Sequence, residues 1–517
     1  MRIPFPERIP IHRAALVAVV FFVIQRVEGT ALYFCTGCLV FVLLTTVAFN
    51  VSGGLARASG AYIFFYSVLV VLIGLGYKAF LGEPAQSNLA DPRTDIEVYV
   101  GGMAVMLAAA FASRRFSRRS GLLQYMLSDS QMYRSSVGCM VFGVAADFAI
   151  NLMGESAEWL STAFGQLNQL IPLGIIIGVI YEIRRSGGRR CINLPVLIGA
   201  GYFFGMGVLN FAKQGMLTPL FCWLLPVWAM QYRLSRVQVL GGLLSLFVIF
   251  HYLVPYAQYG RAYLAPDQTF ADRLAIALPL LEHAEATREA YYEEQDMVPG
   301  GGLNSYYNTP QGFWERLQFI SVDDALINAT DQGKVFGYLP LKLELLNTVP
   351  HIFWPDKPMF NLGNTYAHEL GDFSPEDTTT GISFSPTSEA YHMGKWSGLL
   401  VVAPILWFVF FVTFDSLFGD LRATPWGLLV IVSLAHYAPE TALSGIIHLL
   451  TFGVEILVFC AVFATWGAPV IASAILGPER SSQSNSPHSR PSTSMLNAFA
   501  RFRTHRERGE RPMPGNQ

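Results

Sequence analysis

Residues 347–400 read NTVPHIFWPDKPMFNLGNTYAHELGDFSPEDTTTGISFSPTSEAYHMGKWSGLL, and the rest of the chain is organised around this stretch. It is the one long region rich in proline, glycine, histidine, acidic and aromatic residues in a chain that is otherwise mostly apolar. Of 517 residues, 52% are hydrophobic and only 14% are charged, whereas soluble domains carry about 25% charged residues. The composition therefore predicts a polytopic membrane protein, with this polar stretch lying over the membrane surface.

Apolar segments on both sides of the stretch are long enough to cross a bilayer, which takes about 20 apolar residues. Twelve spans are predicted, at 12–28, 31–50, 60–81, 96–113, 135–153, 158–181, 192–212, 215–232, 236–255, 397–415, 425–444 and 446–475. The predicted fold is an all-α polytopic membrane protein of about 12 transmembrane helices with one large, partly helical external loop. Nine helices fall in residues 1–255, the loop is 256–396, and three helices fall in 397–475. Residues 476–517, rich in serine, proline and arginine, are predicted to be a disordered basic cytoplasmic tail.

Charge is segregated along the chain in a way that sets the orientation. Residues 256–396 hold 19 of the 37 acidic residues and 8 of the 35 basic ones, a balance of −11 that leaves +9 for the remainder. The arginine-rich segments 114–119 and 182–190 both follow even-numbered spans. Basic loops stay on the cytoplasmic side, so both termini are predicted to be cytoplasmic and the acidic loop to face outward.

The external loop shows helical spacing in two places. Residues 270–295 have apolar residues on one side and acids on the other, and residues 312–349 divide into two helical pieces separated near Gly333 to Pro340. Prolines at 350, 355 and 358 exclude a long helix in the part that follows.

Glu389, Tyr391 and His392 form the cluster SEAYHMG directly before the tenth span. Glutamate and histidine are common general bases, and burial can raise a carboxyl pKa toward neutrality. Glu389 and His392 are therefore the candidate catalytic residues. The competing interpretation is that Glu389 caps the helix or pairs with Lys395.

Basic side chains are scarce in the acidic loop, so those present are candidates for binding an anion. Arginine forms two parallel hydrogen bonds with phosphate oxygens and keeps its charge. Arg261 with Lys357 or Lys395 is thus predicted to bind a phosphate or pyrophosphate group, unless these cations only balance nearby carboxylates. Aromatic side chains of the loop either form an interfacial belt or stack on sugar rings. The remaining candidates for substrate binding are Trp354, Tyr391 and His351.

Several kinds of chemistry have no support in the sequence. The spacing of His351, His368 and His392 fits no metal motif, and there is no nucleotide-binding loop. Cys35 and Cys38 form a CxxC inside an apolar segment, where two small packing residues are the better interpretation. The acidic pair at 323–324 is expected on the solvated face of an amphipathic helix. No metal, no cofactor and no nucleic-acid partner is expected.

The segments VPHIFWPDKP (349–358) and TSEAYHMGKWSGLL (387–400) resemble motifs of the bacterial O-antigen polymerases and oligosaccharide repeat-unit polymerases. The similarity covers about 50 residues in detail, and the rest of the chain shares only the many-span architecture with a late large loop. After the tyrosine that family often has Asn-Phe-Gly, where this chain has His392-Met393-Gly394.

The resemblance implies a glycosyltransferase of the bacterial inner membrane that joins undecaprenyl-pyrophosphate-linked repeat units on the periplasmic face. It also implies a flippase and a chain-length regulator of the same pathway as partners. An acceptor hydroxyl would attack the anomeric carbon while the lipid pyrophosphate leaves, through a transition state with positive charge on the sugar. Arg261 with Lys357 or Lys395 would neutralise the leaving group, and Glu389 would take the proton.

Two other classes of function remain open from the residues alone, together with a ligase that uses a different acceptor. A lipid-linked glycan flippase or other proton-coupled transporter would rely on ionisable residues within the spans, because a charge in lipid is costly. These residues are Asp147, His251, Glu440 and Glu455. A non-catalytic subunit of a polysaccharide assembly would need neither set.

Overall fold

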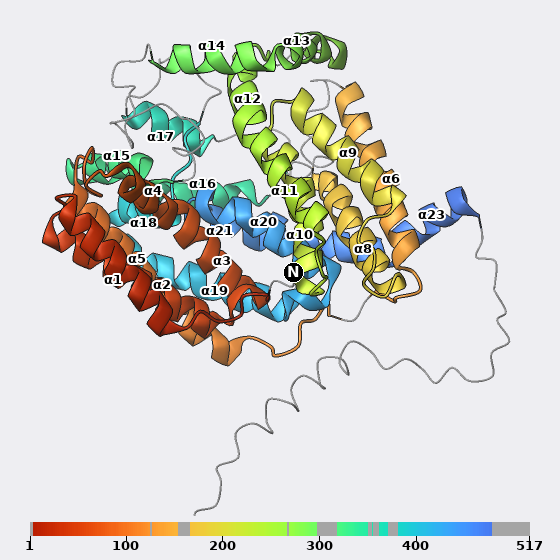
Figure 1. Cartoon of the computed structure of the whole chain (residues 1–517). Helices are drawn as coiled ribbons and strands as arrows, with labels where there is room; N and C mark the ends of the chain where they lie inside the picture. Colours follow the sequence, from red (N-terminus) through yellow and green to blue (C-terminus); the bar gives the residue numbers. More distant parts are fainter. Residues whose placement is uncertain are drawn as a thin grey trace, which may run out of the picture. The chain divides into compact units, whose positions relative to one another are not determined.

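The computed structural model describes residues 4–124, 127–153, 166–265, 268–296, 318–349, 354, 361–370 and 381–477. Every regular element in these ranges is a helix, so the predicted all-α class is confirmed (Figure 1). The predicted tail from residue 478 onward lies outside the described residues.

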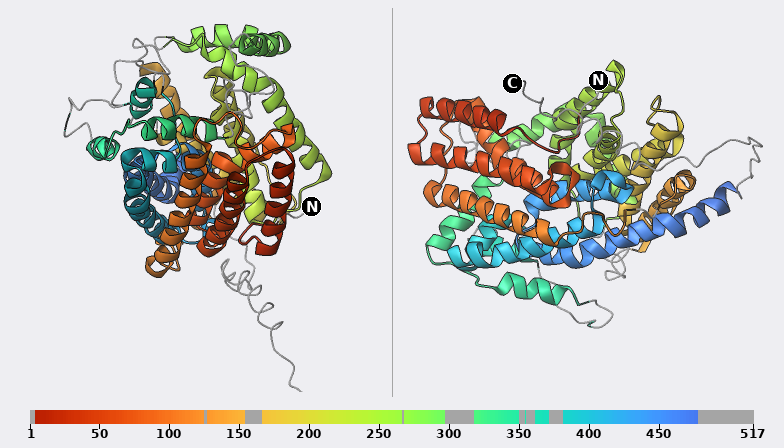
Figure 2. Two further views of the ribbon diagram at one scale, coloured as in Figure 1. Left: turned by 90° about the vertical axis from the view of Figure 1, so that its left-hand side faces the viewer. Right: turned by 90° about the horizontal axis from the view of Figure 1, so that it is seen from below.

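The N-terminal part of the chain forms helices that are bounded by clear capping residues. Asp91 caps the helix that starts at Pro92, accepting the Thr94 N–H with its side chain, and Gly53 ends an earlier helix at φ +94°. These helices are α1 (Ile11–Val27), α2 (Leu32–Ser52), η1 (Gly54–Ala56), α3 (Ala58–Tyr66), η2 (Ser67–Leu72), α4 (Ile73–Leu81) and α5 (Pro92–Phe116). Helix α2 packs between α1 and α5 (Figure 2). Cys35 and Cys38 of α2 are both buried.

The middle of the chain contains a second group of packed helices. They are α6 (Met132–Met153), η4 (Gln166–Gln169), α8 (Leu170–Arg185), α9 (Leu194–Leu209), α10 (Lys213–Ala229), α11 (Arg236–Val248), η5 (Ile249–Leu253) and α12 (Val254–Arg261). Helix α8 contacts α6, α9 and α10 and is buried along most of its length. Helix α11 has no buried residue, as expected for a helix that faces lipid.

The predicted external loop contains short helices rather than a separate domain. They are α13 (Phe270–Glu282), α14 (Ala284–Asp296), α15 (Ile320–Asp331), α16 (Leu339–Asn347), α17 (Leu362–Leu370) and α18 (Pro386–Gly394). The helical spacing predicted over 270–295 is confirmed as two helices, and the two pieces predicted over 312–349 are α15 and α16. Figure 1 shows α13 and α14 lying crosswise to α12.

The C-terminal part of the chain forms a further group of helices, some of which are short π-helices. They are η7 (Gly398–Val402), α19 (Ala403–Phe418), η8 (Leu421–Ala423), α20 (Pro425–Glu440), α21 (Gly445–His448), η9 (Leu449–Gly453), α22 (Val454–Val462), η10 (Phe463–Gly467) and α23 (Ala468–Leu476). Helix α3 from the N-terminal part packs against both α19 and α20.

Each of the twelve predicted spans overlaps a described helix, although residues 158–165 of the sixth span lie outside the described residues and α1, α9, α10 and α20 are only 16 or 17 residues long. Seven helical stretches in the described chain are long and apolar enough to cross a membrane. They are Leu32–Ser52, Ala58–Leu81, Pro92–Phe116, Leu167–Arg185, Arg236–Arg261, Gly398–Ala423 and Gly445–Leu476. The protein is therefore a polytopic membrane protein, and twelve spans stays a prediction.

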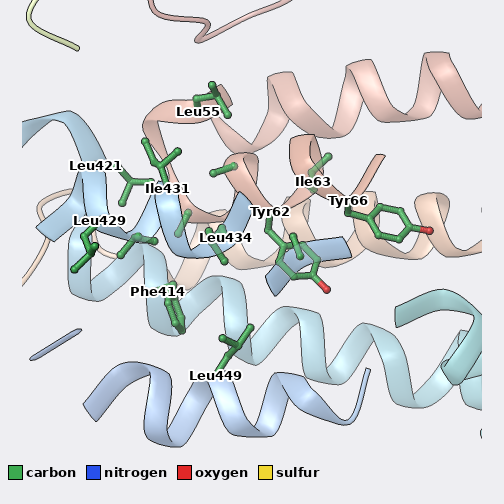
Figure 3. Close-up of a cluster of buried hydrophobic side chains, with 14 of the residues drawn as sticks. Leu55, Tyr62, Ile63, Tyr66, Phe414, Leu421, Leu429, Ile431, Leu434 and Leu449 are labelled. Carbon is green, nitrogen blue, oxygen red and sulfur yellow. The ribbon is translucent and has the colours of Figure 1, made fainter. Parts of the chain in front are cut away.

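A buried apolar cluster joins helix α3 of the N-terminal part to helices of the C-terminal part (Figure 3). Tyr62 on α3 lies against Phe410 of α19, with ring centroids 5.1 Å apart, and its hydroxyl accepts the Trp407 indole N–H at 3.3 Å. Asp415 of α19 accepts the Ser59 hydroxyl at 2.7 Å and the Ser59 N–H at 3.2 Å. These contacts fix α19 against the N-terminal helices, and α18, which precedes α19, is positioned with it.

Candidate active site

Helix α18 is the buried element that carries the predicted catalytic cluster. Ser385 caps its N-terminus and Pro386 occupies the first turn, where a missing N–H costs nothing. Every residue from Pro386 to Met393 is buried. The helix ends at Lys395, a non-glycine residue with φ +53°, and the chain then turns into η7. A Cβ on Gly398 would lie 2.0 Å from the Ala390 carbonyl oxygen, so this turn requires glycine.

Glu389 is fully buried and both of its carboxyl oxygens accept hydrogen bonds. Its Oε1 accepts the hydroxyls of Tyr366 at 2.8 Å and Ser444 at 2.9 Å, and its Oε2 accepts the Ser444 N–H at 2.7 Å. Burial raises the pKa of the Glu389 carboxyl, and the three donors oppose that shift. The predicted alternative, a pair with Lys395, is wrong because Lys395 binds Asp331 at 3.1 Å.

His392 lies one turn further along α18 and is also fully buried. Its Nδ1 is 2.7 Å from Oγ1 of Thr330, a residue of α15. The Thr330 hydroxyl donates its single hydrogen to the Leu326 carbonyl at 2.6 Å. Oγ1 must then accept from the imidazole, so His392 carries its proton on Nδ1 and has a lone pair on Nε2.

The Nε2 atom of His392 has no hydrogen-bond partner among the described residues. The rings of Phe336 and Tyr366 pack edge-on against the imidazole, at centroid distances of 5.0 and 5.6 Å. Burial lowers the pKa of His392 from its ordinary 6.5 to about 4. The imidazole is therefore neutral at pH 7, with a basic nitrogen in an apolar surrounding.

Asp323 on α15 is buried under the start of α18. The prediction that residues 323 and 324 lie on a solvated helix face is therefore wrong. The Asp323 carboxylate accepts the Tyr99 hydroxyl at 2.7 Å, the Ser385 N–H at 2.9 Å and the Ser388 hydroxyl at 2.6 Å. Burial raises the pKa of Asp323, and these donors oppose the shift. The carboxylate therefore fixes α18 to α15 and α5.

The second member of that pair, Asp324, is also buried and accepts the backbone N–H groups of Ala90 and Asp91 at 2.8 to 3.0 Å. Asp95 on α5 lies beside Asp324. Asp95 is 1% exposed and forms a side-chain hydrogen bond with Asp324. The apolar face of α15 was predicted from spacing, but the face that carries both acids is buried as well.

Asp331 at the end of α15 binds Tyr391 and Lys395, two of the predicted substrate-binding residues. It accepts the Tyr391 hydroxyl at 2.8 Å and the Thr94 hydroxyl at 3.1 Å, and it pairs with Lys395. Burial would raise the pKa of Asp331, but these partners together hold it below its ordinary value. Tyr391 is only 3% exposed, so its ring packs inside the protein rather than offering a face to a sugar.

Arg261 lies at the C-terminal end of α12 and belongs to a different cluster. Its Nε donates to the Phe211 carbonyl at 3.0 Å, and its charge interacts with Glu440 at the end of α20. Glu440 in turn pairs with His436 at 3.3 Å. Since Ser444 follows Glu440 by four residues and binds Glu389, the α20–α21 turn connects the Arg261 cluster to the α18 site.

The other predicted residues are placed as follows. Trp354 is 36% exposed. Lys357 and His351 lie outside the described residues, and the structure does not test them. Of the residues that a transporter would use, Asp147 binds the Tyr202 hydroxyl at 2.6 Å, His251 stacks on Phe247, and Glu455 is exposed.

The sequence reasoning missed Thr330, Ser444, Tyr366 and Asp323, the four residues that contact Glu389, His392 or the start of α18. Thr330 lies 62 residues before His392, Asp323 lies 65 residues before Ser388, and Ser444 lies 55 residues after Glu389. No local pattern identifies such partners. In the described residues no group of three or more histidine, cysteine, aspartate or glutamate side chains is arranged to hold a metal ion.

The arrangement is suited to proton transfer. A histidine with one nitrogen oriented by a hydroxyl and the other left with a free lone pair has the geometry of a general base. Both oxygens of the Glu389 carboxylate already accept hydrogen bonds, so Glu389 instead holds Tyr366 against His392. No family model, no curated protein and no solved structure matches this chain.

Proposed function

We propose that this chain is a membrane glycosyltransferase that joins lipid-linked oligosaccharide repeat units into a surface polysaccharide. The donor is the growing glycan on undecaprenyl pyrophosphate and the acceptor is a single lipid-linked repeat. The enzyme lies in the bacterial inner membrane with both termini cytoplasmic, and the 256–396 segment carries the site on the periplasmic face. A flippase and a chain-length regulator act beside it.

The observation that carries this proposal is the buried, neutral His392, whose Nε2 has no hydrogen-bond partner in the described part of the chain. In the reaction the acceptor hydroxyl gives its proton to Nε2 and forms a bond to the anomeric carbon. The bond between that carbon and the pyrophosphate oxygen breaks, and the lipid pyrophosphate leaves with the electron pair. Thr330 keeps Nδ1 protonated throughout, which holds the lone pair on the reacting nitrogen.

Glu389 has a positioning role in this proposal and not the proton-accepting role that the sequence suggested. Its carboxylate binds Tyr366, whose ring borders the imidazole, and it fixes Ser444 at the α20–α21 turn. Arg261 is connected to the same turn through Glu440. Arg261 supplies positive charge for the departing pyrophosphate, with Lys357 as a second candidate.

The test is chain length in surface glycans after single substitutions. Cells that express only His392→Gln are expected to retain single repeat units and lose long chains, because removing a general base slows a reaction by about 10² to 10⁴-fold. His283→Gln is the matched control, since His283 is exposed between α13 and α14. Protein content of the membrane fraction is measured in both strains.

The outcomes separate this function from its alternatives. Normal chain length in His392→Gln, with normal protein content, would overturn the proposal. Repeat units trapped on the cytoplasmic side in Asp147→Asn cells would favour a flippase instead. Normal glycans in both variants would favour a non-catalytic subunit.

A further inference from the structure

A second site lies away from α18, in a pocket with a volume of about 490 Å³ between the end of α8 and the start of α9. Its size is within the range of about 300 to 1,000 Å³ that is common for small-molecule sites. The side chains that matter for its chemistry are Tyr133, Glu182, Arg185, Arg190, Asn193 and Leu197.

The charges in this pocket sum to one positive charge. Arg185 and Arg190 contribute two positive charges, and the buried Glu182 contributes one negative charge. The neighbouring Arg184 pairs with Asp129. One monoanion would therefore neutralise the pocket.

The loop that carries Arg190 has a defined conformation. Ser186 accepts the Arg190 N–H at 2.9 Å and donates to the Arg190 carbonyl at 3.0 Å. Gly187 and Gly188 have φ of +62° and +79°, which permits this tight turn. Arg190 is thus held at the mouth of the pocket by its own backbone.

The start of α9 adds a favourable field for an anion. Asn193 caps this helix, accepting the Val196 N–H at 3.0 Å and donating to the Gly178 carbonyl at 3.3 Å. A helix N-terminus carries partial positive charge. Because Asn193 and Leu197 line the pocket, that end of α9 borders the space between the two arginines.

The position of the pocket matches the headgroup level of a bilayer. Helix α8 belongs to a candidate membrane span that ends at Arg185, and α9 is an apolar helix that begins at Leu194. Leu194, Leu197 and Ile198 are 62% to 69% exposed. The exposed apolar side chains of α9 therefore offer a surface for hydrocarbon chains beside the pocket.

We propose that this pocket binds the phosphodiester headgroup of an anionic phospholipid, with its acyl chains lying on the exposed face of α9. A phosphodiester carries one negative charge, which equals the net charge of the pocket. Arginines bind its two free oxygens through paired hydrogen bonds. Basic pockets between membrane helices are known sites for such headgroups, and this one does not depend on the glycosyltransferase proposal.

The test uses the purified full-length protein in a neutral detergent and measures binding of short-chain phosphatidylglycerol by native mass spectrometry. Arg190→Gln is expected to weaken binding about tenfold, the effect of losing one charge-assisted contact. Arg189→Gln is the matched control, because the adjacent Arg189 is exposed and does not line the pocket. The double variant Arg185→Gln/Arg190→Gln should bind phosphatidylglycerol no better than zwitterionic phosphatidylcholine.

Three results would overturn the proposal. The first is equal binding of phosphatidylglycerol and phosphatidylcholine by the unmodified protein. The second is equal loss in Arg190→Gln and Arg189→Gln. The third is binding of glycerol phosphate, which has no acyl chains, as tightly as the lipid, because that would indicate a soluble anion site. If the double variant does not fold, the two exposed single variants still decide the result.

Discussion

His392 makes stability depend on pH in a way that can be worked out from its surroundings. In the folded protein the imidazole is buried and neutral, and its pKa is lowered from 6.5 to about 4. In the unfolded chain the same imidazole is in water and takes up a proton as the pH falls below 6.5. The stabilisation from a neutral His392 is therefore full above pH 6.5 and is lost progressively as the pH falls toward 4.

The size of the effect follows from the two pKa values. They differ by about 2.5 pH units, and each unit corresponds to about 1.4 kcal/mol. Between pH 7 and pH 4 the folded state should thus lose about 3 kcal/mol at this one residue. That is a large share of the roughly 5 to 15 kcal/mol that holds a typical domain folded.

The measurement compares the unmodified protein with His392→Gln by equilibrium unfolding in detergent micelles over this pH range. Glutamine does not titrate and can still donate a hydrogen bond to Thr330. Glu389 and Asp323, whose pKa values burial raises, favour the folded state as the pH falls. They are present in both proteins, so their contribution cancels in the comparison.

The expected result is that the difference in unfolding free energy between the two proteins shifts by about 3 kcal/mol in favour of His392→Gln on acidification. His283→Gln, at an exposed position, should keep the pH profile of the unmodified protein. Parallel profiles for His392→Gln and the unmodified protein would refute the assignment of a buried, neutral imidazole.

Five further substitutions at four positions test the hydrogen-bond networks of α15 and α18, each measured by unfolding at pH 7. Thr330→Val should cost about 1 to 3 kcal/mol, because the imidazole N–H is left unpaired, while Thr330→Ser should cost less than Thr330→Val. Asp323→Asn should cost about 3 kcal/mol, since an amide nitrogen faces one of three donors; an unchanged stability would contradict its role in fixing α18. Ser444→Ala should cost about 1 kcal/mol, because the Ser444 N–H still binds Glu389; a loss as large as that of Asp323→Asn would contradict this division. Asp95→Asn should leave stability within about 1 kcal/mol of the unmodified protein, because the amide can replace the side-chain hydrogen bond between Asp95 and Asp324; a loss of about 3 kcal/mol would contradict this contact.

The sequence was sufficient for the class of protein because composition and span length act directly on the bilayer. A run of about 20 apolar residues either crosses a membrane or exposes a large apolar surface to water. The same local reasoning predicted α15 and α16; the break between them was expected near Gly333 to Pro340 and lies between Asp331 and Leu339. It also selected α18, because Glu389, Tyr391 and His392 stand together next to a span.

Local patterns were less informative about what those side chains do. From spacing alone, the acids at 323 and 324 would lie on a solvated face of the helix. In the structure both are buried, and they accept hydrogen bonds from groups at the starts of α5 and α18. Lys395 was a candidate anion ligand, and Asp331 binds it. Tyr391 was a candidate sugar platform, and its ring is buried.

By itself the sequence determined a polytopic α-helical membrane protein and the location of its polar cluster at 388–394, since both depend on neighbours in the chain. Only the tertiary structure decided that both Glu389 oxygens accept hydrogen bonds while the His392 Nε2 has no partner among the described residues. The physical reason is distance along the chain. The roles of these two residues are set by Thr330, Tyr366 and Ser444, which are brought to α18 by the packing of separate helices.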